Sequence, residues 1–316
     1  MLFSVSVIIP VFNAGRFIEK AIQSALIQEE VQEVIVVNDG STDNSLVLIK
    51  ELQKTDQRIK IFHHKNNENK GRSISRNLGI KKATGNYMAF LDADDFFLEN
   101  RFLKDKELFE TKQECDGVYN AIGAEFYRKP TLTEKEELTL FTVKKKIKPK
   151  DLFKVLIEGE AGHFSIDALT VKKSIFNKVG YFNKSLEVSE DTELLWRMAL
   201  KCNLEAGIID RPVAMRGVHQ ENVFNNQDLY KKNRIKMYKS LAIWSGYNNV
   251  SVQKKDRILK WLWLLRFKEN YGWFKDTLFW LGILIKAPSY MLTILSVKYF
   301  PLVRKRQQYF SFFYKK

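Results

Sequence analysis

Two short runs of β-branched, almost uninterrupted apolar residues limit what this chain can fold into. They are VSVIIPV at residues 5–11 and EVIVVND at residues 33–39. Strands that are buried on both faces of a parallel sheet have this composition. Between the two runs, apolar residues at positions 18, 21, 22 and 25 follow the spacing of one face of a helix. The sequence therefore opens with a predicted β-α-β unit.

The same alternation continues to residue 95. A turn and helix at 39–52, a strand at 58–64, a helix at 70–85 and a strand at 86–95 follow in order. Alternating units of this kind predict an α/β fold with a mostly parallel central sheet flanked by helices, similar to a Rossmann arrangement. The chain has no G-x-x-x-x-G-K-[S/T] and no G-x-G-x-x-G sequence, which disfavours P-loop and dinucleotide-binding folds.

Charge divides the 316 residues into two parts. Residues 228–316 contain 19 Lys and Arg against 4 Asp and Glu, whereas residues 1–227 contain 33 of each. Five of the six tryptophans also lie after residue 227. We therefore predict an α/β catalytic domain over 1–227 and a helical, basic and aromatic region over 228–316. Within the first domain, the highly charged stretch 129–150 is expected to form a flexible loop or an edge hairpin.

The termini and cysteines suggest the compartment. The first residues, MLFSVSVIIPVFNAG, have a short apolar run with no preceding basic residues, which favours a strand over a signal peptide. Cys115 and Cys202 are the only cysteines, and two cysteines form neither a disulfide framework nor a structural zinc site by themselves. A reducing, cytoplasmic location is the expectation.

Acidic residues cluster where the predicted strands end. Asp39 follows the second strand, and FLDADDF at 90–96 places Asp92, Asp94 and Asp95 after the fourth. Ligands of such sheets bind outside the carboxyl ends of the strands. The cluster is either a turn with Asp95 as a helix cap, or a ligand set for Mg²⁺ or Mn²⁺, which would in turn hold the phosphates of a nucleotide diphosphate.

Two further acidic positions leave alternatives open. Asp39 in the Asp-Gly-Ser turn either shapes the turn or accepts hydrogen bonds from a nucleobase or ribose. Glu190 and Asp191 begin a predicted helix whose apolar face includes Leu195 and Met198. Acidic residues there stabilise the helix dipole, but a general base also belongs on a rigid element at the edge of a cleft.

Five blocks in order over residues 4–225 resemble the family 2 glycosyltransferases, which have the GT-A fold and are typical of bacterial polysaccharide assembly. They are SVIIPVFN, EVIVVNDGSTDNS, NKGRSISRNLGIKKATGNYMAFLDADD, VGYFNKSL and EDTELLWRMA. The chain departs from the family pattern at Asn38, where Asp is frequent, and at Lys70 and Arg72, where small residues are usual. These departures affect the expected donor contacts more than the expected chemistry.

The resemblance implies an inverting, metal-dependent transfer from a nucleotide-diphosphate sugar, a UDP-sugar first of all, to a hydroxyl of a lipid-linked or growing glycan. It assigns roles to the matching residues: Pro10, Phe12, Asn13, Asp39 and Arg76 near the nucleotide, Asp92 at the ribose or the water shell of the metal, Asp94 on Mn²⁺ or Mg²⁺, and Asp191 as general base. His219 resembles a residue that in some members reaches the metal or diphosphate, and its alternative is a structural role. A sugar nucleotidyltransferase and a non-catalytic nucleotide-sugar-binding assembly protein are the competing functions.

The basic region suggests a place of action. Residues 277–297 are mostly apolar, but Lys286 and Pro288 near the centre disfavour a membrane-spanning helix. Interfacial helices with Trp and Phe on one side and Lys and Arg on the other fit better, because basic clusters attract anionic lipids. We therefore predict peripheral binding to the cytoplasmic face of the cell membrane, where a polyprenyl-linked acceptor would reside. Internal packing or homo-oligomerisation is the alternative, and no recognisable nucleic-acid module accompanies the charge.

Overall fold

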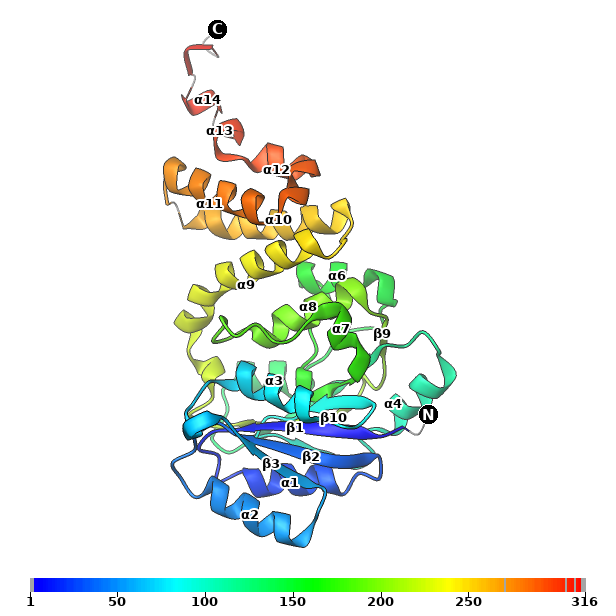
Figure 1. Ribbon diagram of the computed structural model, residues 1–316. Coiled ribbons are helices and arrows are strands. Elements are labelled where there is room, and N and C mark those ends of the chain that lie inside the picture. The colour runs from blue at the N-terminus through cyan, green and yellow to red at the C-terminus, as the bar shows by residue number, and fades with distance from the viewer. Residues whose placement is uncertain (1–2, 270, 305, 310, 314–316) are drawn as a thin grey trace. The chain divides into compact units, whose positions relative to one another are not determined.

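The computed structural model describes residues 3–269, 271–304, 306–309 and 311–313. The chain divides into two compact units, Met1–Asn225 and Asn226–Lys316. Each unit has its own secondary structure, and each is described below by itself (Figure 1).

A seven-stranded sheet in the order β3-β2-β1-β4-β8-β6-β9 forms the centre of the first unit. Its strands are β1 (Val5–Val11), β2 (Val31–Asn38), β3 (Ile59–His63), β4 (Tyr87–Phe90), β6 (Gly117–Tyr119), β8 (Leu169–Lys172) and β9 (Leu204–Ala206). The first four run parallel, and β8 is antiparallel to both of its neighbours. The predicted α/β fold with a largely parallel central sheet is confirmed.

Helices cover both faces of this sheet, as the alternating pattern predicted. Helices α1 (Ile18–Leu26) and α2 (Ser45–Thr55) lie on one face, and α3 (Arg72–Lys82) lies on the other (Figure 1). The predicted apolar face of α1 is buried, since its residues at 18, 21, 22 and 25 are all inaccessible to solvent. Because β1, β2 and β4 run parallel, their carboxyl ends lie along one edge of the sheet, and the acidic residues lie at this edge.

The other helices of the first unit are α4 (Leu103–Thr111), α5 (Leu132–Leu138), α6 (Pro149–Glu158), α7 (Phe176–Val179) and α8 (Glu190–Lys201). The expectation of a flexible loop or edge hairpin over 129–150 was wrong for much of that stretch. Thr131 and Glu134 form a reciprocal capping box that starts α5, because Thr-x-x-Glu satisfies two backbone N–H groups at a helix start. Pro149 occupies the first turn of α6.

A second sheet of three strands, in the order β5-β10-β7, adjoins the exit of β4. It consists of β5 (Phe96–Phe97), β7 (Ala121–Phe126) and β10 (Pro212–Val218). Asp95 accepts a hydrogen bond of 2.9 Å from the N–H of Gly217 on β10. Asp95 is therefore not a helix cap, as one alternative had it, because the chain enters β5 next and α4 begins only at Leu103.

The second unit consists of helices α9 (Gln227–Tyr247), α10 (Val252–Lys268), α11 (Trp273–Lys286), α12 (Ile294–Tyr299), α13 (Pro301–Arg304) and α14 (Arg306–Tyr309). Two tryptophans form its core: the Trp263 ring centroid lies 5.8 Å from that of Trp280, and both side chains are about 1% exposed. The apolar stretch 277–297 is interrupted where α11 ends at Lys286. Within the described part of the chain, every helix is too short or too polar to span a bilayer.

Gly217 allows β10 to approach the exit of β4. A Cβ atom at this position would lie 2.2 Å from the carbonyl oxygen of Asp94. Gly217→Ala should therefore lower the free energy of unfolding of the first unit by about 1–3 kcal/mol, the usual cost of overpacking, and its melting temperature with it. Thermal unfolding followed by circular dichroism measures this.

The control is Gly282→Ala in α11 of the second unit, where the added Cβ meets nothing within 4 Å. This variant should leave the unfolding transition of the first unit unchanged. An unchanged melting temperature in Gly217→Ala would contradict the packing argument.

Candidate active site

The loops that follow β1 and β2 are joined by hydrogen bonds. Asn13 has a positive φ of 50°, and its side-chain oxygen accepts a hydrogen bond of 2.8 Å from the N–H of Thr42. Its own N–H donates to Ser41 Oγ at 3.1 Å. Phe12 is 50% exposed, and Pro10 is half-buried on β1 beside Val37. These contacts make a rigid, partly apolar rim that suits a planar ring.

Asp39 lies at this rim but already has partners. Its carboxylate accepts hydrogen bonds from the N–H groups of Lys70 at 2.7 Å and Gly71 at 2.8 Å. His64 Nε2 lies 3.4 Å from the same carboxylate. Asp39 therefore holds the connection between β3 and α3 in place. Its predicted contact with a nucleobase stays a prediction, which would use the remaining lone pairs of the carboxylate.

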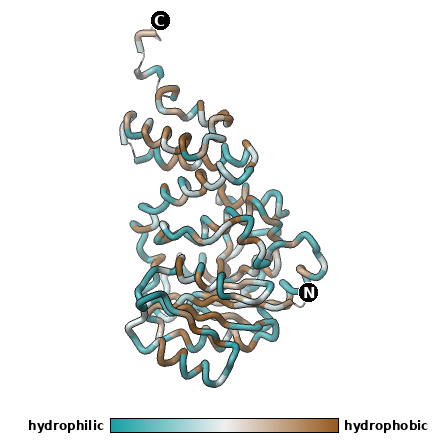
Figure 2. Tube along the Cα trace, in the orientation of Figure 1, coloured by the Kyte–Doolittle hydropathy of each residue, from teal (hydrophilic) through white to brown (hydrophobic). Residues whose placement is uncertain are grey.

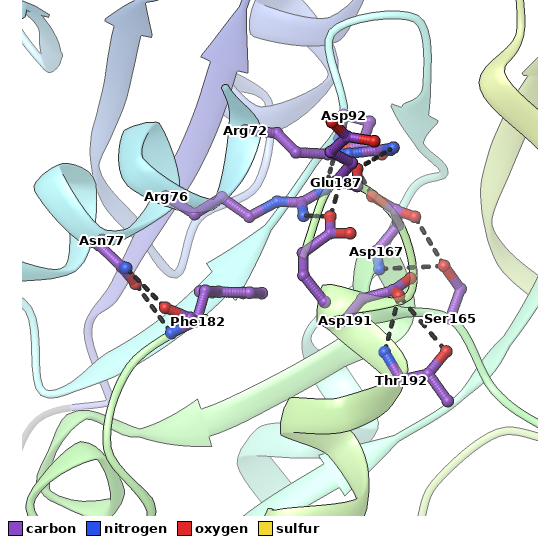
Figure 3. A network of polar contacts seen from close by, with 11 residues as sticks. Arg72, Arg76, Asn77, Asp92, Ser165, Asp167, Phe182, Glu187, Asp191 and Thr192 are labelled. Atoms are coloured by element: carbon purple, nitrogen blue, oxygen red, sulfur yellow. Dashed lines mark hydrogen bonds and ion pairs between the residues drawn. The ribbon is translucent and has the colours of Figure 1, made fainter. Parts of the chain in front are cut away.

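Arg76 connects three elements of the first unit. From α3, it donates to Glu190 Oε1 on α8 at 2.8 Å and to Asp92 Oδ1 beyond β4. Arg72, one turn earlier, lies 3.1 Å from the same Glu190 oxygen. Figure 3 shows both arginine side chains extending toward Asp92. The result is a continuous chain of ion pairs, Arg72–Glu190–Arg76–Asp92, between the strand exit and the start of α8.

These charges stabilise one another in a buried environment. Burial by itself lowers the pKa of Arg76, but the negative charges of Asp92, Glu190 and Asp191 raise it above its ordinary value. Burial raises the pKa of Asp92, and Arg76 and Arg72 bring it below the ordinary value. Burial and Asp191 raise the pKa of Glu190, against the effect of the two arginines. Arg76 therefore stays a cation, and its two terminal nitrogens hold the carboxylates of Glu190 and Asp92.

Asp94 and His219 are in contact, and their implied contact with a metal stays a prediction. His219 Nε2 lies 2.9 Å from Asp94 Oδ2, and the Asn222 side chain donates to the same oxygen at 3.0 Å. His219 Nδ1 accepts a hydrogen bond of 3.3 Å from the N–H of Glu221. That contact assigns the proton of the neutral ring to Nε2, which then donates to Asp94. The Asp94 side chain is 28% exposed, so this oxygen and nitrogen pair is accessible.

An acidic cluster lies beside this pair, and Asp167 is the member that the sequence did not predict. Asp92, Asp95 and Asp167 each bring a carboxylate oxygen within 4.8 Å of the others. Burial and the charge of Asp92 raise the pKa of Asp167 to about 6. Burial and the neighbouring carboxylates raise the pKa of Asp95 well above its usual range. Asp167 accepts hydrogen bonds from the Asp92 N–H at 3.0 Å and from Ser165 Oγ at 2.6 Å.

Asp191 is the second residue of α8. Its Oδ1 accepts hydrogen bonds from the N–H of Thr192 at 2.6 Å and from Thr192 Oγ1 at 3.3 Å. Among the described residues, Oδ2 accepts no hydrogen bond. Ser189, directly before the helix, has φ 61° and ψ 18°, a left-handed conformation that is uncommon for serine. This turn directs Glu190 to the arginines and leaves one oxygen of Asp191 available.

The structure brings only some of the predicted residues together. Arg76 contacts Asp92 directly, and Asp94 contacts His219, whereas within the described residues no hydrogen bond joins Asn13 or Asp39 to either pair. The prediction missed the partnership of Glu190 with both arginines, although the Glu-Asp pair was visible. Asp167 and Asn222 were missed as well. Asn222 lies only three residues after His219, but nothing in the sequence around Asp167 distinguishes it.

Comparisons with known proteins identify the relatives of this chain. The model of the family described as glycosyl transferase family 2 matches residues 6–179. An uncharacterised glycosyltransferase of Rickettsia bellii is 52% identical over 98 residues, which are 31% of this chain but only 14% of that protein's length. The matched stretch is thus a small part of that relative. The family match ends before Asp191 and His219, so their places rest on the geometry given above.

Two solved structures share the fold. S. aureus TarS 1–349 in complex with UDP-GlcNAc has a TM-score of 0.63 at 19% identity, over 94% of this chain and 82% of TarS 1–349. The mannosyltransferase PcManGT of Pyrobaculum calidifontis, in complex with GDP-Man and Mn²⁺, has a TM-score of 0.55 at 15% identity, over 99% of this chain and 81% of PcManGT. Because the family model spans more than half of the chain, from β1 to the end of α7, the chain belongs to glycosyl transferase family 2 and has its GT-A fold.

Proposed function

We propose that this protein transfers a sugar from a nucleotide-diphosphate sugar to a hydroxyl group of an acceptor, with inversion at the anomeric carbon. The observation that carries the proposal is the ion-pair chain Arg72–Glu190–Arg76–Asp92. It links the cation that would face the leaving diphosphate to the first turn of α8, which bears Asp191. The group proposed to face the leaving diphosphate and the group proposed to accept the proton are thereby held at fixed positions relative to each other, as a displacement reaction requires.

A UDP-sugar is the proposed donor. TarS was solved with UDP-GlcNAc and PcManGT with GDP-Man, so nucleotide-diphosphate sugars bind to proteins of this fold. In this chain, Phe12 and the Asn13 loop would lie against the nucleobase together with Pro10, and Asp39 would accept a hydrogen bond from it. Arg76 and Asp92 would lie toward the phosphates and ribose.

Asp94 and His219 fit a divalent cation, Mn²⁺ or Mg²⁺. The Asp94 carboxylate suits Mn²⁺ or Mg²⁺, and the His219 nitrogen 2.9 Å from it would become a second ligand after it loses its proton. When bound, the cation would offset the negative charge of the leaving diphosphate. Asp92, Asp95 and Asp167 form an alternative ligand set, but Asp95 and Asp167 are each less than 5% exposed. We assign the ion to the accessible pair for that reason.

Asp191 is the proposed general base. Its Oδ2 would accept the proton of the acceptor hydroxyl as that oxygen bonds to the anomeric carbon and the bond to the nucleotide diphosphate breaks. The leaving diphosphate would depart with the bonding electrons and face Arg76. Glu190 cannot take this part, because its carboxylate is buried and bound to two arginines.

We further infer that the acceptor is a lipid-linked or growing glycan and that the protein binds peripherally at the cytoplasmic face of the cell membrane. The excess of 15 positive charges after residue 227 supports this location, since each basic residue near an anionic surface contributes about 1 kcal/mol. Self-association of the second unit is the alternative use of that region.

The metal assignment can be tested with a matched pair of variants. Asp94→Ala should abolish the Mn²⁺-dependent part of UDP binding and donor hydrolysis, because it removes one of two accessible ligands. Asp167→Asn keeps the acceptor oxygen for the Asp92 N–H and should retain that dependence. Isothermal titration with UDP, with Mn²⁺ and with a chelator, measures both. If Asp167→Asn lost the metal effect and Asp94→Ala kept it, the ion would belong to the buried cluster.

The base assignment predicts a separation of binding from turnover. Asp191→Asn has nearly the same shape, so UDP affinity and the melting temperature should persist. Sugar transfer should fall by about 10²-fold or more, the usual contribution of general base catalysis. Asp210→Asn, an exposed aspartate in the loop before β10, is the control and should transfer at the normal rate. Normal transfer by Asp191→Asn would leave Asp191 only its role at the helix dipole.

A further inference from the structure

Helix α11 exposes an apolar stripe along its length. Phe274, Leu278, Leu281 and Ile285 are 59%, 54%, 41% and 74% exposed. Their spacings of four, three and four residues place them on one side of the helix. Hydrophobic residues recur along this helix in Figure 2. A stripe of large apolar side chains in water is unfavourable unless something covers it.

The opposite side of α11 already forms the core of the second unit. Trp280 and Ile283 are each 1% exposed there, and the Trp280 indole donates to the carbonyl oxygen of Ser296 at 3.2 Å. Asp276 on the same side is buried and accepts a hydrogen bond of 2.8 Å from Arg266. The stripe is therefore not needed to hold α11 in its own unit.

The next segment extends the apolar surface. Met291, Leu292, Ile294 and Val297 are 58%, 78%, 77% and 60% exposed. The short helix η5 (Pro288–Leu292) packs on both α11 and α12, so these four residues form a second exposed apolar group in the same unit. We call the eight residues 274, 278, 281, 285, 291, 292, 294 and 297 the outer face.

The outer face differs from the surface that the sequence predicted. The sequence predicted interfacial helices with Trp and Phe on the lipid side, but Trp263 and Trp280 are buried against each other. Trp261 and Trp244 are half-buried. The exposed apolar residues are instead aliphatic, with Phe274 beside Trp273, which is 47% exposed.

Charge decides between the candidate occupants of this face. From Trp273 to Arg304 the chain has one acidic residue, Asp276, and it is buried. The basic residues of the same stretch, Lys275, Lys286, Lys298 and Arg304, are all exposed. A second copy of the face would bring like charges together, which is unfavourable. Anionic lipid headgroups complement the lysines, and acyl chains accept the aliphatic stripe.

We propose that the outer face is the surface by which this protein binds anionic lipid bilayers, with α11 lying in the interface. The inference rests on the peripheral location proposed above, and adds to it the contacting residues and the lipid chemistry. It does not depend on the assignment of the catalytic groups. An experiment can therefore reject the lipid-binding proposal and support the sugar-transfer proposal, or reject sugar transfer and support lipid binding.

Co-sedimentation of the full chain with vesicles tests the proposal. The chain should pellet with vesicles that contain phosphatidylglycerol and bind pure phosphatidylcholine at least about tenfold more weakly, because several lysines lose their partners. The triple variant Leu278→Gln, Leu281→Gln, Ile285→Gln should bind anionic vesicles at least about tenfold more weakly than the unaltered chain, because the apolar contact is lost.

A matched triple variant in the first unit provides the control. Ile27, Val47 and Leu132 are 63%, 60% and 80% exposed, so Ile27→Gln, Val47→Gln, Leu132→Gln removes similar exposed apolar area elsewhere. It should pellet as the unaltered chain does. UDP titration without vesicles checks that each variant is folded and reports separately on the proposed donor site.

Three results would overturn the proposal. The unaltered chain could stay in the supernatant with anionic vesicles at low salt. The α11 triple variant could bind as tightly as its control. Light scattering could show that the unaltered chain is a dimer and the α11 triple variant a monomer, while both bind vesicles equally. The outer face would then be an interface between two copies.

Discussion

The buried carboxylate of Glu190 is the contact on which the arrangement of the site depends. It accepts a hydrogen bond from Arg76 and forms an ion pair with Arg72, and Arg76 also donates a hydrogen bond to Asp92. Removing one member of a buried ion pair typically costs 3–5 kcal/mol, so α3, α8 and the exit of β4 are held in one relative position. Asp191 is adjacent in sequence to Glu190, so the contacts that position Glu190 also position Asp191. The carboxylate that orients the helix and the carboxylate with a free oxygen are therefore neighbours with different tasks.

The second constraint is the close approach of β10 to the acidic turn. Gly217 has no side chain, and its N–H donates to Asp95. The strand therefore reaches the Asp92–Asp95 turn directly, and two residues later His219 meets Asp94. Three carboxylates come together at that turn, and burial with mutual repulsion raises the pKa of Asp95 and Asp167. The close approach of β10 thus places His219 and the buried carboxyl group of Asp95 beside Asp94.

The second unit is rich in both aromatic and basic residues, but the two kinds of residue have different places in its structure. Four of its aromatic side chains, Tyr238, Trp263, Trp280 and Tyr290, are buried. Cations lie over buried and exposed rings alike: the Arg304 guanidinium is 5.0 Å from the Trp263 ring and that of Arg266 is 3.8 Å from the Tyr271 ring. Such contacts stabilise a small helical unit whose net charge would otherwise favour expansion. The outward side of α11 is aliphatic and flanked by lysines. Composition predicted an aromatic and basic surface, whereas packing placed two of the five tryptophans, Trp263 and Trp280, in the core.

The sequence by itself determined the fold class, the α1 face and the strand-exit residues, because burial on both faces of a sheet and the 3.6-residue helical period leave local patterns. Through the family resemblance it also predicted Asp94 as a metal ligand and His219 as a residue near the metal or diphosphate, and the two side chains lie within hydrogen-bond distance. Only the tertiary structure decided that Asp39 binds the 70–71 backbone, that Glu190 pairs with two arginines and that Asp167 joins the acidic cluster. These contacts join residues 31 to 118 positions apart. Local periodicity carries no information about such pairs, and they form only where the folded chain brings separate elements within hydrogen-bond distance.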